Sequence, residues 1–290
     1  TGGFSETVDF DPGAGIVELT SAGSFDVFVS KLDANGNLLW ARRVGGTSDD
    51  SGGGVVVDGS GYVYVTGHFF SGTVDFDPGA GIVELTSAGF YDVFVLKLNG
   101  SGDFVWARHM GGSGSDVGNA VAGDAAGNVY ITGYFNGTAD FDPGAGTSEL
   151  TSAGLSDVFA LKLDSNGALV WASRAGGTDF DNGDGVVVDG GNVYVTGAFR
   201  ETADFDPGAS TSELTSAGGF DGFVWKLNGA AGGVVWTRRV GDAGSDTGHD
   251  VVVDGSGNAY VTGGFTGTAD FDPGAGTSNL TSAGSADGFV

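Results

Sequence analysis

The sequence contains no cysteine. A disulfide framework, a zinc site with thiolate ligands and a catalytic thiol are therefore excluded, because each requires a cysteine sulfur. Positive charge is also scarce: 11 Lys and Arg residues against 37 Asp and Glu residues give a formal net charge of −26. A chain with this charge repels phosphate backbones and anionic membrane surfaces and attracts cations. We therefore expect no nucleic-acid partner.

Long apolar runs are absent too. No segment approaches the ~18 consecutive apolar residues of a membrane-spanning helix, and no N-terminal stretch has the residue order of a secretory signal. We expect a soluble chain without membrane insertion. The sequence begins at Thr1 and ends at Val290, each inside a strand-like run. We therefore interpret it as a part of something longer.

Proline is rare, and all five prolines belong to one motif, Asp-Phe-Asp-Pro-Gly. The motif begins at Asp9, Asp75, Asp140, Asp204 and Asp270, and the glycines recur in the same frame. Successive copies start about 65 residues apart, and a near-constant period of this kind indicates a repeat architecture. We expect one repeat domain over residues 1–290, with frames 1–65, 66–131, 132–195, 196–261 and a partial frame 262–290.

Each frame holds two hairpin signals separated by one long loop. In residues 54–108, β-branched and aromatic runs at 55–58 and 62–67 flank a Gly-Ser-Gly turn, which is typical of a hairpin. After the long loop, runs at 92–98 and 104–108 flank a second turn with two glycines. The sequence therefore predicts an all-β chain with four antiparallel strands in each repeat of about 65 residues, and four and a half repeats in total.

The predicted third strand is apolar on both faces. Phe94 and Leu96 alternate with Val93 and Val95, and only Lys97 interrupts the run. We expect such a strand to be covered on both sides. A two-layer sandwich would bury one face of each strand, and a β-solenoid has far shorter coils. The blades of a β-propeller, stacked between neighbours, fit the pattern better.

Two stretches carry a resemblance to a known family. Residues 251–258, Val-Val-Val-Asp-Gly-Ser-Gly-Asn, with Tyr-Val-Thr-Gly at 260–263, and residues 31–41, Lys-Leu-Asp-Ala-Asn-Gly-Asn-Leu-Leu-Trp-Ala, resemble the bacterial β-propeller repeat of the seven-bladed type. The resemblance implies a secreted or cell-surface bacterial protein whose repeats form a non-catalytic scaffold or adhesive module. The inserted loop lengthens each repeat beyond the ~40–45 residues of common propellers. Four and a half units do not close a ring by themselves, so the blade number stays open.

The repeated acidic loop has a sharp functional interpretation. Two carboxylates lie two residues apart in each copy, and Ca²⁺ prefers six to eight oxygen ligands from carboxylates, carbonyls and water. The candidate calcium ligands are Asp9, Asp11, Asp75, Asp77, Asp140, Asp142, Asp204, Asp206, Asp270 and Asp272. The alternative is turn chemistry, in which an Asp side chain caps its own backbone. Turn chemistry accounts for one carboxylate in each loop and leaves the second unexplained.

Three further series recur. One precedes the first strand, and we expect it to cap turns or, alternatively, to form an acidic ring at a channel mouth: Asp50, Asp116, Asp181 and Asp246. Another opens the third strand and is a source of an additional cation ligand: Asp26, Asp92, Asp157, Asp221 and Asp287. Tryptophans recur in the fourth strand, where we expect packing between blades in preference to stacking on sugars: Trp40, Trp106, Trp171 and Trp236. Ten of the eleven basic residues lie in the third and fourth strands, where charge discourages edge-to-edge pairing.

Enzyme signatures are missing. His68, His109 and His249 occupy three different positions of the repeat, so they form no repeated metal shell and no evident acid–base pair. We predict a non-enzymatic, calcium-stabilised scaffold, adhesion or assembly module, located extracellularly or at the cell surface. Its partners are other protein chains or other domains of the same chain, and surface glycans are a further candidate. The alternatives are a lectin-like propeller, a polysaccharide lyase or glycosidase, and a filament in which neighbouring chains complete each other's blades.

Overall fold

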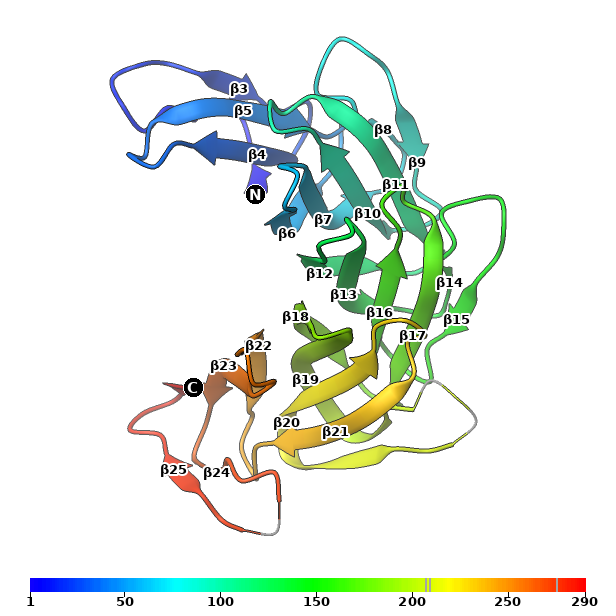
Figure 1. The fold of residues 1–290 in the computed structure, drawn as a ribbon, viewed down its shortest axis with the longest axis vertical. Coiled ribbons are helices and arrows are strands. Elements are labelled where there is room, and N and C mark those ends of the chain that lie inside the picture. The colour runs from blue at the N-terminus through cyan, green and yellow to red at the C-terminus, as the bar shows by residue number, and fades with distance from the viewer. Residues whose placement is uncertain (207, 209, 275) are drawn as a thin grey trace.

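The computed structural model describes residues 1–206, 208, 210–274 and 276–290. Within these residues the regular elements are 26 β-strands, and no segment is a helix. No helix in the described part of the chain is long and apolar enough to cross a membrane. The strands form a series of antiparallel units that follow one another around a curve (Figure 1). The predicted all-β architecture is therefore confirmed.

Four strands make up each of the three middle units, and each strand pairs with its neighbour in the unit. Unit II contains β6 (Asp50–Val57), β7 (Val63–Phe70), β10 (Tyr91–Leu98) and β11 (Phe104–Gly112). Unit III contains β12 (Val117–Gly123), β13 (Val129–Phe135), β16 (Asp157–Leu163) and β17 (Leu169–Gly177). Unit IV contains β18 (Asn182–Asp189), β19 (Asn192–Asp204), β20 (Glu213–Asn228) and β21 (Val234–Val240).

The two outer units contain three main strands each. Unit I contains β1 (Gly2–Phe4), β4 (Asp26–Leu32) and β5 (Leu38–Val44), which correspond to the second, third and fourth strands of the middle units. Unit V contains β22 (Thr247–Val253), β23 (Ala259–Phe265) and β26 (Asp287–Phe289), which correspond to the first, second and third strands.

The long loop between the second and third strands folds into a short hairpin whose first strand ends at the first Asp of the Asp-Phe-Asp-Pro-Gly motif. These hairpins are β2 (Thr7–Asp9) with β3 (Glu18–Thr20), β8 (Thr73–Asp75) with β9 (Glu84–Thr86), β14 (Thr138–Asp140) with β15 (Glu149–Thr151), and β24 (Thr268–Asp270) with β25 (Asn279–Thr281). In unit IV the hairpin continues β19 and β20 without a break. Two of the hairpins also pair with the end of the preceding unit's fourth strand, as β14 does with β11.

The hydrophobic core lies between adjacent units. In β10, Val93 and Val95 pack against unit III, whereas Phe94 and Leu96 pack toward unit I, and all four side chains are fully buried. The prediction of a third strand covered on both faces is therefore confirmed. Four such clusters follow one another along the chain, so the stability of each unit depends on its neighbours.

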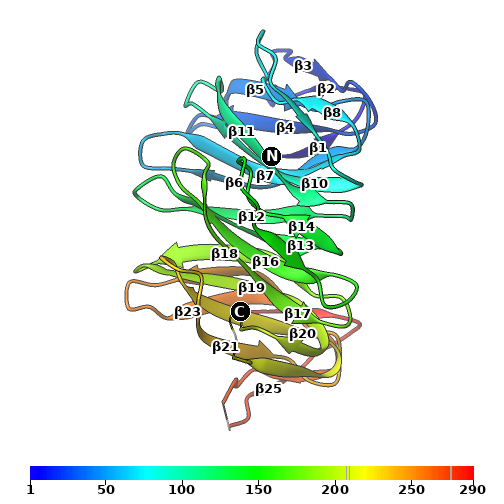
Figure 2. The same cartoon turned by 90° about the vertical axis from the view of Figure 1, so that its right-hand side faces the viewer.

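The first strands β6, β12, β18 and β22 line the concave side of the curve, and the inserted hairpins lie at its outer edge (Figure 1). Neighbouring first strands contact one another. When the molecule is turned, units I to IV follow one another from top to bottom, and unit V overlaps unit IV in the view (Figure 2). Side chains at the start of the first strands therefore meet across unit boundaries on the concave side.

Candidate functional site

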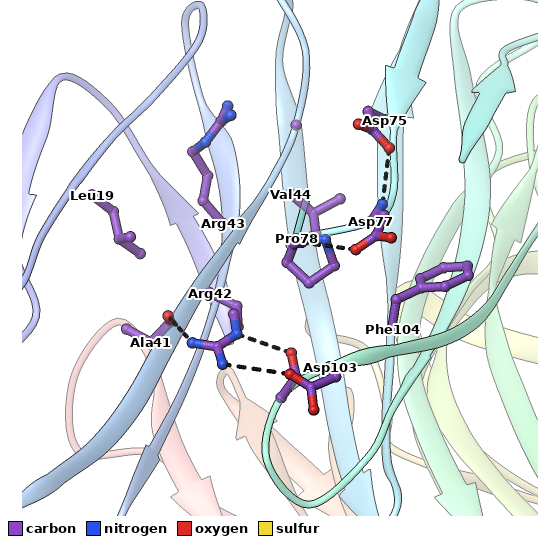
Figure 3. Close-up of a pocket in the computed structure, with 13 residues that line it drawn as sticks. Leu19, Ala41, Arg42, Arg43, Val44, Asp75, Asp77, Pro78, Asp103 and Phe104 are labelled. Carbon is purple, nitrogen blue, oxygen red and sulfur yellow. Dashed lines mark hydrogen bonds and ion pairs between the residues drawn. The ribbon is translucent and has the colours of Figure 1, made fainter. Parts of the chain in front are cut away.

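The first carboxylate of each acidic loop joins the two sides of the inserted hairpin. Asp75 Oδ1 accepts the backbone N–H of Asp77 at 3.0 Å (Figure 3) and that of Val83 at 2.8 Å. The same pair of bonds is made by Asp9, Asp140, Asp204 and Asp270. Backbone donors favour the charged carboxylate, and they hold the pKa of Asp9 and of Asp270 below the usual range.

The second carboxylate of each loop also caps the backbone. Asp77 Oδ1 accepts the N–H of Gly79 at 2.8 Å, which closes a tight turn around Pro78. Equivalent bonds join Asp11 to Gly13, Asp142 to Gly144, Asp206 to Gly208, and Asp272 to Gly274. Turn chemistry therefore engages both carboxylates of the motif, whereas the sequence analysis attributed only one to it.

Positive charge near the acidic loop comes from the preceding unit. Asp75 and Asp77 line a cavity of about 510 Å³ together with Arg42 and Arg43, which lie on β5 of unit I (Figure 3). Within the described residues, no group of three or more His, Asp and Glu side chains gathers in a way that could hold a metal ion. The Oδ2 atoms of the loop carboxylates are the ligands that a cation would use, and calcium binding stays a prediction.

The Asp series before the first strand is a set of buried caps. Asp116 Oδ2 accepts the N–H of Gly112 at 2.7 Å, and its Oδ1 accepts that of Asn136 at 3.3 Å. Asp50, Asp181 and Asp246 make the same two bonds. Burial raises the pKa of Asp116 to about 7. These bonds hold three chain segments together. Because all four residues are buried, the alternative of an accessible acidic ring is wrong.

The Asp series that opens the third strand lies beside these caps. A Cβ placed on Gly111 would contact both Asp92 and Asp116, which locates the two carboxyl groups next to that glycine. Arg43, Arg174 and Arg239 pair with three members of the series, Asp26, Asp157 and Asp221. These contacts give the series a partner other than the loop cation that the sequence analysis suggested.

The recurring tryptophans and basic residues connect each unit to the next. Lys97 Nζ and Trp106 Nε1 both donate to the carbonyl oxygen of Ser165, in the following unit's turn, at 3.1 and 3.2 Å. Arg108 Nε donates to Gly167 O at 3.2 Å in the same turn. Equivalent bonds run from Lys31, Trp40 and Arg42 to residues 100–102, and from Lys162, Trp171 and Ser173 to Gly229 and Gly232. We call each of these groups an inter-unit clasp.

The clasps decide between two interpretations of these residues. Trp106 and Trp171 are only 8% and 7% exposed, so packing between units is confirmed for them and they offer no stacking surface to a sugar. The interpretation of the basic residues as charges that protect a strand edge is wrong for the clasps, because their donors bind carbonyl oxygens of the adjacent unit. The lysine also lies over aromatic rings, with Lys97 Nζ 4.9 Å from the Tyr64 ring centroid.

One feature of the concave side escaped the sequence analysis. Asp184 and His249 line a single cavity of about 640 Å³ with residues of units III, IV and V. Burial raises the pKa of Asp184 to about 6, and the nearby charge of His249 opposes that shift. The histidines had been interpreted as incidental because they do not repeat. A search for the positions at which the repeats differ would have found this pair.

These observations define an all-β repeat protein built from units of antiparallel strands. Residues 39–68 and 235–264 match the family described as beta-propeller repeat, so the chain carries repeats of that family. Both matches cover the same part of the repeat, from the fourth strand of one unit to the second strand of the next.

Two curated proteins are similar to the chain. An uncharacterized WD repeat-containing protein of Acanthamoeba polyphaga mimivirus is 30% identical over 182 residues, which is 59% of this chain and 13% of that protein. The regulatory protein FlaEY of Caulobacter vibrioides is 28% identical over 177 residues, which is 60% of this chain and 18% of that protein. The matched region spans less than a fifth of either relative's length.

Proposed function

We propose that the chain is a non-enzymatic scaffold module of a secreted or cell-surface bacterial protein. In this proposal each unit is a four-stranded blade of about 65 residues, and the chain contributes four and a half blades to a β-propeller. The resemblance to the bacterial propeller repeat supports the cellular location. Other chains, or other domains of the same protein, are the partners of such a module.

The inter-unit clasp carries the proposal. It brings a lysine, a tryptophan and an arginine of unit II to two carbonyl oxygens of unit III, Ser165 O and Gly167 O. The same arrangement joins units I and II, with Gly100 O as the shared acceptor of Lys31 and Trp40. Hydrogen bonds from charged donors are stronger than neutral ones. A set of similar clasps therefore makes the array stiff, and stiffness is what a scaffold requires.

The clasps and caps are made by the chain's own groups, and calcium held by the acidic loops would add to the stiffness that they give. Mechanical unfolding of the chain between two handles tests the proposal. We expect unfolding events that release more than one unit, because loss of one unit removes the acceptors of its neighbour's clasp. Successive independent events, each releasing a single repeat of about 65 residues, would show uncoupled units and contradict the proposal.

The cellular location has a separate test. An antibody raised against this chain, applied to intact bacteria that carry the gene before and after protease treatment, is expected to detect the protein only before treatment. A signal that survives protease on intact cells and disappears only after lysis would place the protein inside the cell.

A further inference from the structure

The cavity that holds Asp184 and His249 differs from the rest of the molecule in its residue composition. Its walls come from three consecutive units, and it includes the aromatic residues Tyr134, Phe180 and Phe220. Almost everywhere else the units are near copies of one another. The residues at positions where the units differ are therefore not determined by the repeated fold alone.

The residues that line the cavity fall at six positions of the repeat, and at those positions the units differ. The position of Asp184 is occupied in the other units by Gly53, Asn119 and His249. The position of Phe220 is occupied by Phe25, Tyr91, Ser156 and Ala286. The position of Tyr134 is occupied by Gly3, His68, Ala198 and Gly264.

Some of the neighbouring positions, by contrast, are the same in units II to V. Asp181 and Gly183 flank the variable Asn182, and both have identical counterparts in units II, III and V. Successive side chains of a strand point to opposite faces, so the invariant residues serve the junction between units and the variable ones face the cavity. These positions vary in all the units, and in units III to V their side chains gather around one cavity. Side chains that differ between repeats and line a cavity are expected of a surface that recognises a ligand.

A β-bulge places the two central polar residues. The pairing of β18 with β19 shifts between Gly183 and Gly185, and that of β22 with β23 shifts between Gly248 and Asp250. Asp184 and His249 are the extra residues at these two shifts. A bulge leaves the extra residue outside the ladder and redirects its side chain, here toward the cavity.

A chain of hydrogen bonds fixes the polar wall. Asn119 Nδ2 donates to Asn182 Oδ1 at 2.9 Å across the junction between units III and IV, and Asn182 Nδ2 donates to Asp184 Oδ1 at 2.6 Å. The network orients the amides and the carboxylate before any ligand arrives, which lowers the entropy cost of binding. Aromatic rings also line the cavity, and Phe180 is 49% exposed.

We propose that this cavity binds a neutral carbohydrate. Its polar side chains are amides, hydroxyls, an imidazole and one carboxylate, and most of these carry both donors and acceptors. Sugar hydroxyls also donate and accept, whereas a cation requires acceptors only. The rings of Phe180 and Phe220 offer apolar surface to the C–H face of a sugar. Anionic glycans are disfavoured because the lining contains a carboxylate and because the chain carries a charge of −26. The cation beside the cavity, Arg200, lies 5.9 Å from the Phe220 ring centroid and pairs with Asp179 at 3.8 Å.

A glycan array with neutral and acidic oligosaccharides tests the proposal, followed by calorimetry with the strongest neutral binder. We expect Asp184→Asn and Phe220→Ala to weaken binding by at least about tenfold, since each removes an interaction of roughly 1.4 kcal/mol. Asp184→Asn retains the acceptor for Asn182, so the wall stays ordered. Phe25→Ala is the matched control for Phe220→Ala, because Phe25 occupies the same repeat position in unit I and does not line the cavity.

Tightly bound neutral glycans that both cavity variants lose and Phe25→Ala retains would establish the site, provided that the variants keep the wild-type thermal unfolding curve. An array with no neutral binder, a preference for acidic glycans, or equal affinities for all variants would overturn the proposal. Selective capture of lysine-rich peptides in parallel wells would instead assign the carboxylate to a cationic ligand and overturn it too. The scaffold proposal rests on the clasps and would survive any of these results.

Discussion

The indole nitrogen of Trp106 lies 3.2 Å from the carbonyl oxygen of Ser165, although the first residue belongs to unit II and the second to the following unit. Lys97 Nζ reaches the same oxygen at 3.1 Å. Two donors on different strands therefore share one acceptor across a unit boundary. Because both lone pairs of that carbonyl are used, the two donors are expected to act together and not as independent contacts.

Removal of the indole donor tests this coupling. We expect Trp106→Phe to lower the free energy of unfolding by about 1 kcal/mol for the lost hydrogen bond, and by more where the smaller ring leaves a void. Lys97→Met removes the second donor. Urea unfolding of the two single variants and the double variant completes a mutant cycle, in which we expect an interaction energy above about 0.5 kcal/mol. Strictly additive losses would show that the shared acceptor does not couple the donors.

The repeat made much of the fold predictable. The period of the proline motif and the apolar character on both faces of Val93–Leu96 were enough to predict an all-β chain with strands covered on two sides, and the burial of those residues confirms it. The clasps were not predictable, because their acceptors are backbone carbonyls. Trp106 and Ser165 are 59 residues apart, and no side chain of the turn marks it as a partner.

The contacts of the candidate site were also only partly predictable from the sequence. Asp75 and Asp77 were predicted as ligands because their spacing gave only one of them a turn role, but the fold of the hairpin brings the Val83 N–H to Asp75 and leaves the Gly79 N–H to Asp77. Asp184 and His249 were overlooked because they are not repeated. Their proximity depends on two bulges and on the curvature of the array, neither of which has a signature in the sequence.

The acidic loops offer a test that separates capping from metal binding. Asp75→Asn keeps an oxygen that can accept from Asp77 and Val83, whereas Asp75→Ala removes both bonds. We expect the asparagine variant to unfold near the wild-type temperature and the alanine variant to lose about 1–2 kcal/mol. Thermal unfolding in calcium and in EGTA, with metal analysis of the purified protein, completes the test. A large calcium-dependent rise that Asp75→Asn reduces would establish these loops as metal sites.

Close approach of the strands makes particular glycines indispensable. A Cβ on Gly133 would lie 1.8 Å from the carbonyl oxygen of Val117, on the paired strand β12. We expect Gly133→Ala to cost about 3 kcal/mol, because the backbone of a buried sheet cannot yield without loss of pairing. Gly59→Ala is the control, since a Cβ at Gly59 would have no atom within 4 Å, and we expect a change below about 0.5 kcal/mol. Equal stabilities in chemical denaturation would refute the steric argument.

The buried caps give the protein an unusual dependence on pH. Burial raises the pKa of Asp116 and Asp181 to about 7 and that of Asp50 to about 6, whereas a carboxyl group in an unfolded chain titrates near about 3.9. Between these values the folded protein binds more protons than the unfolded chain. The contribution of the caps to stability is therefore fully present below about pH 4 and is lost as the pH rises through about 7.

Other carboxyl groups act in the opposite sense at lower pH. Hydrogen bonds from Asn258 lower the pKa of Asp254 to about 2, so its contribution is present above the unfolded pKa and is lost as the pH falls through about 2. We expect the melting temperature to reach a maximum near about pH 4 and to decline as the pH rises to about 7. Asp116→Asn should flatten that decline, and Glu18→Gln, at an exposed position, should leave it unchanged. Calorimetric scans across this pH range test the prediction. A melting temperature that is constant or rises from pH 5 to 8 would mean that the caps remain charged in the folded protein.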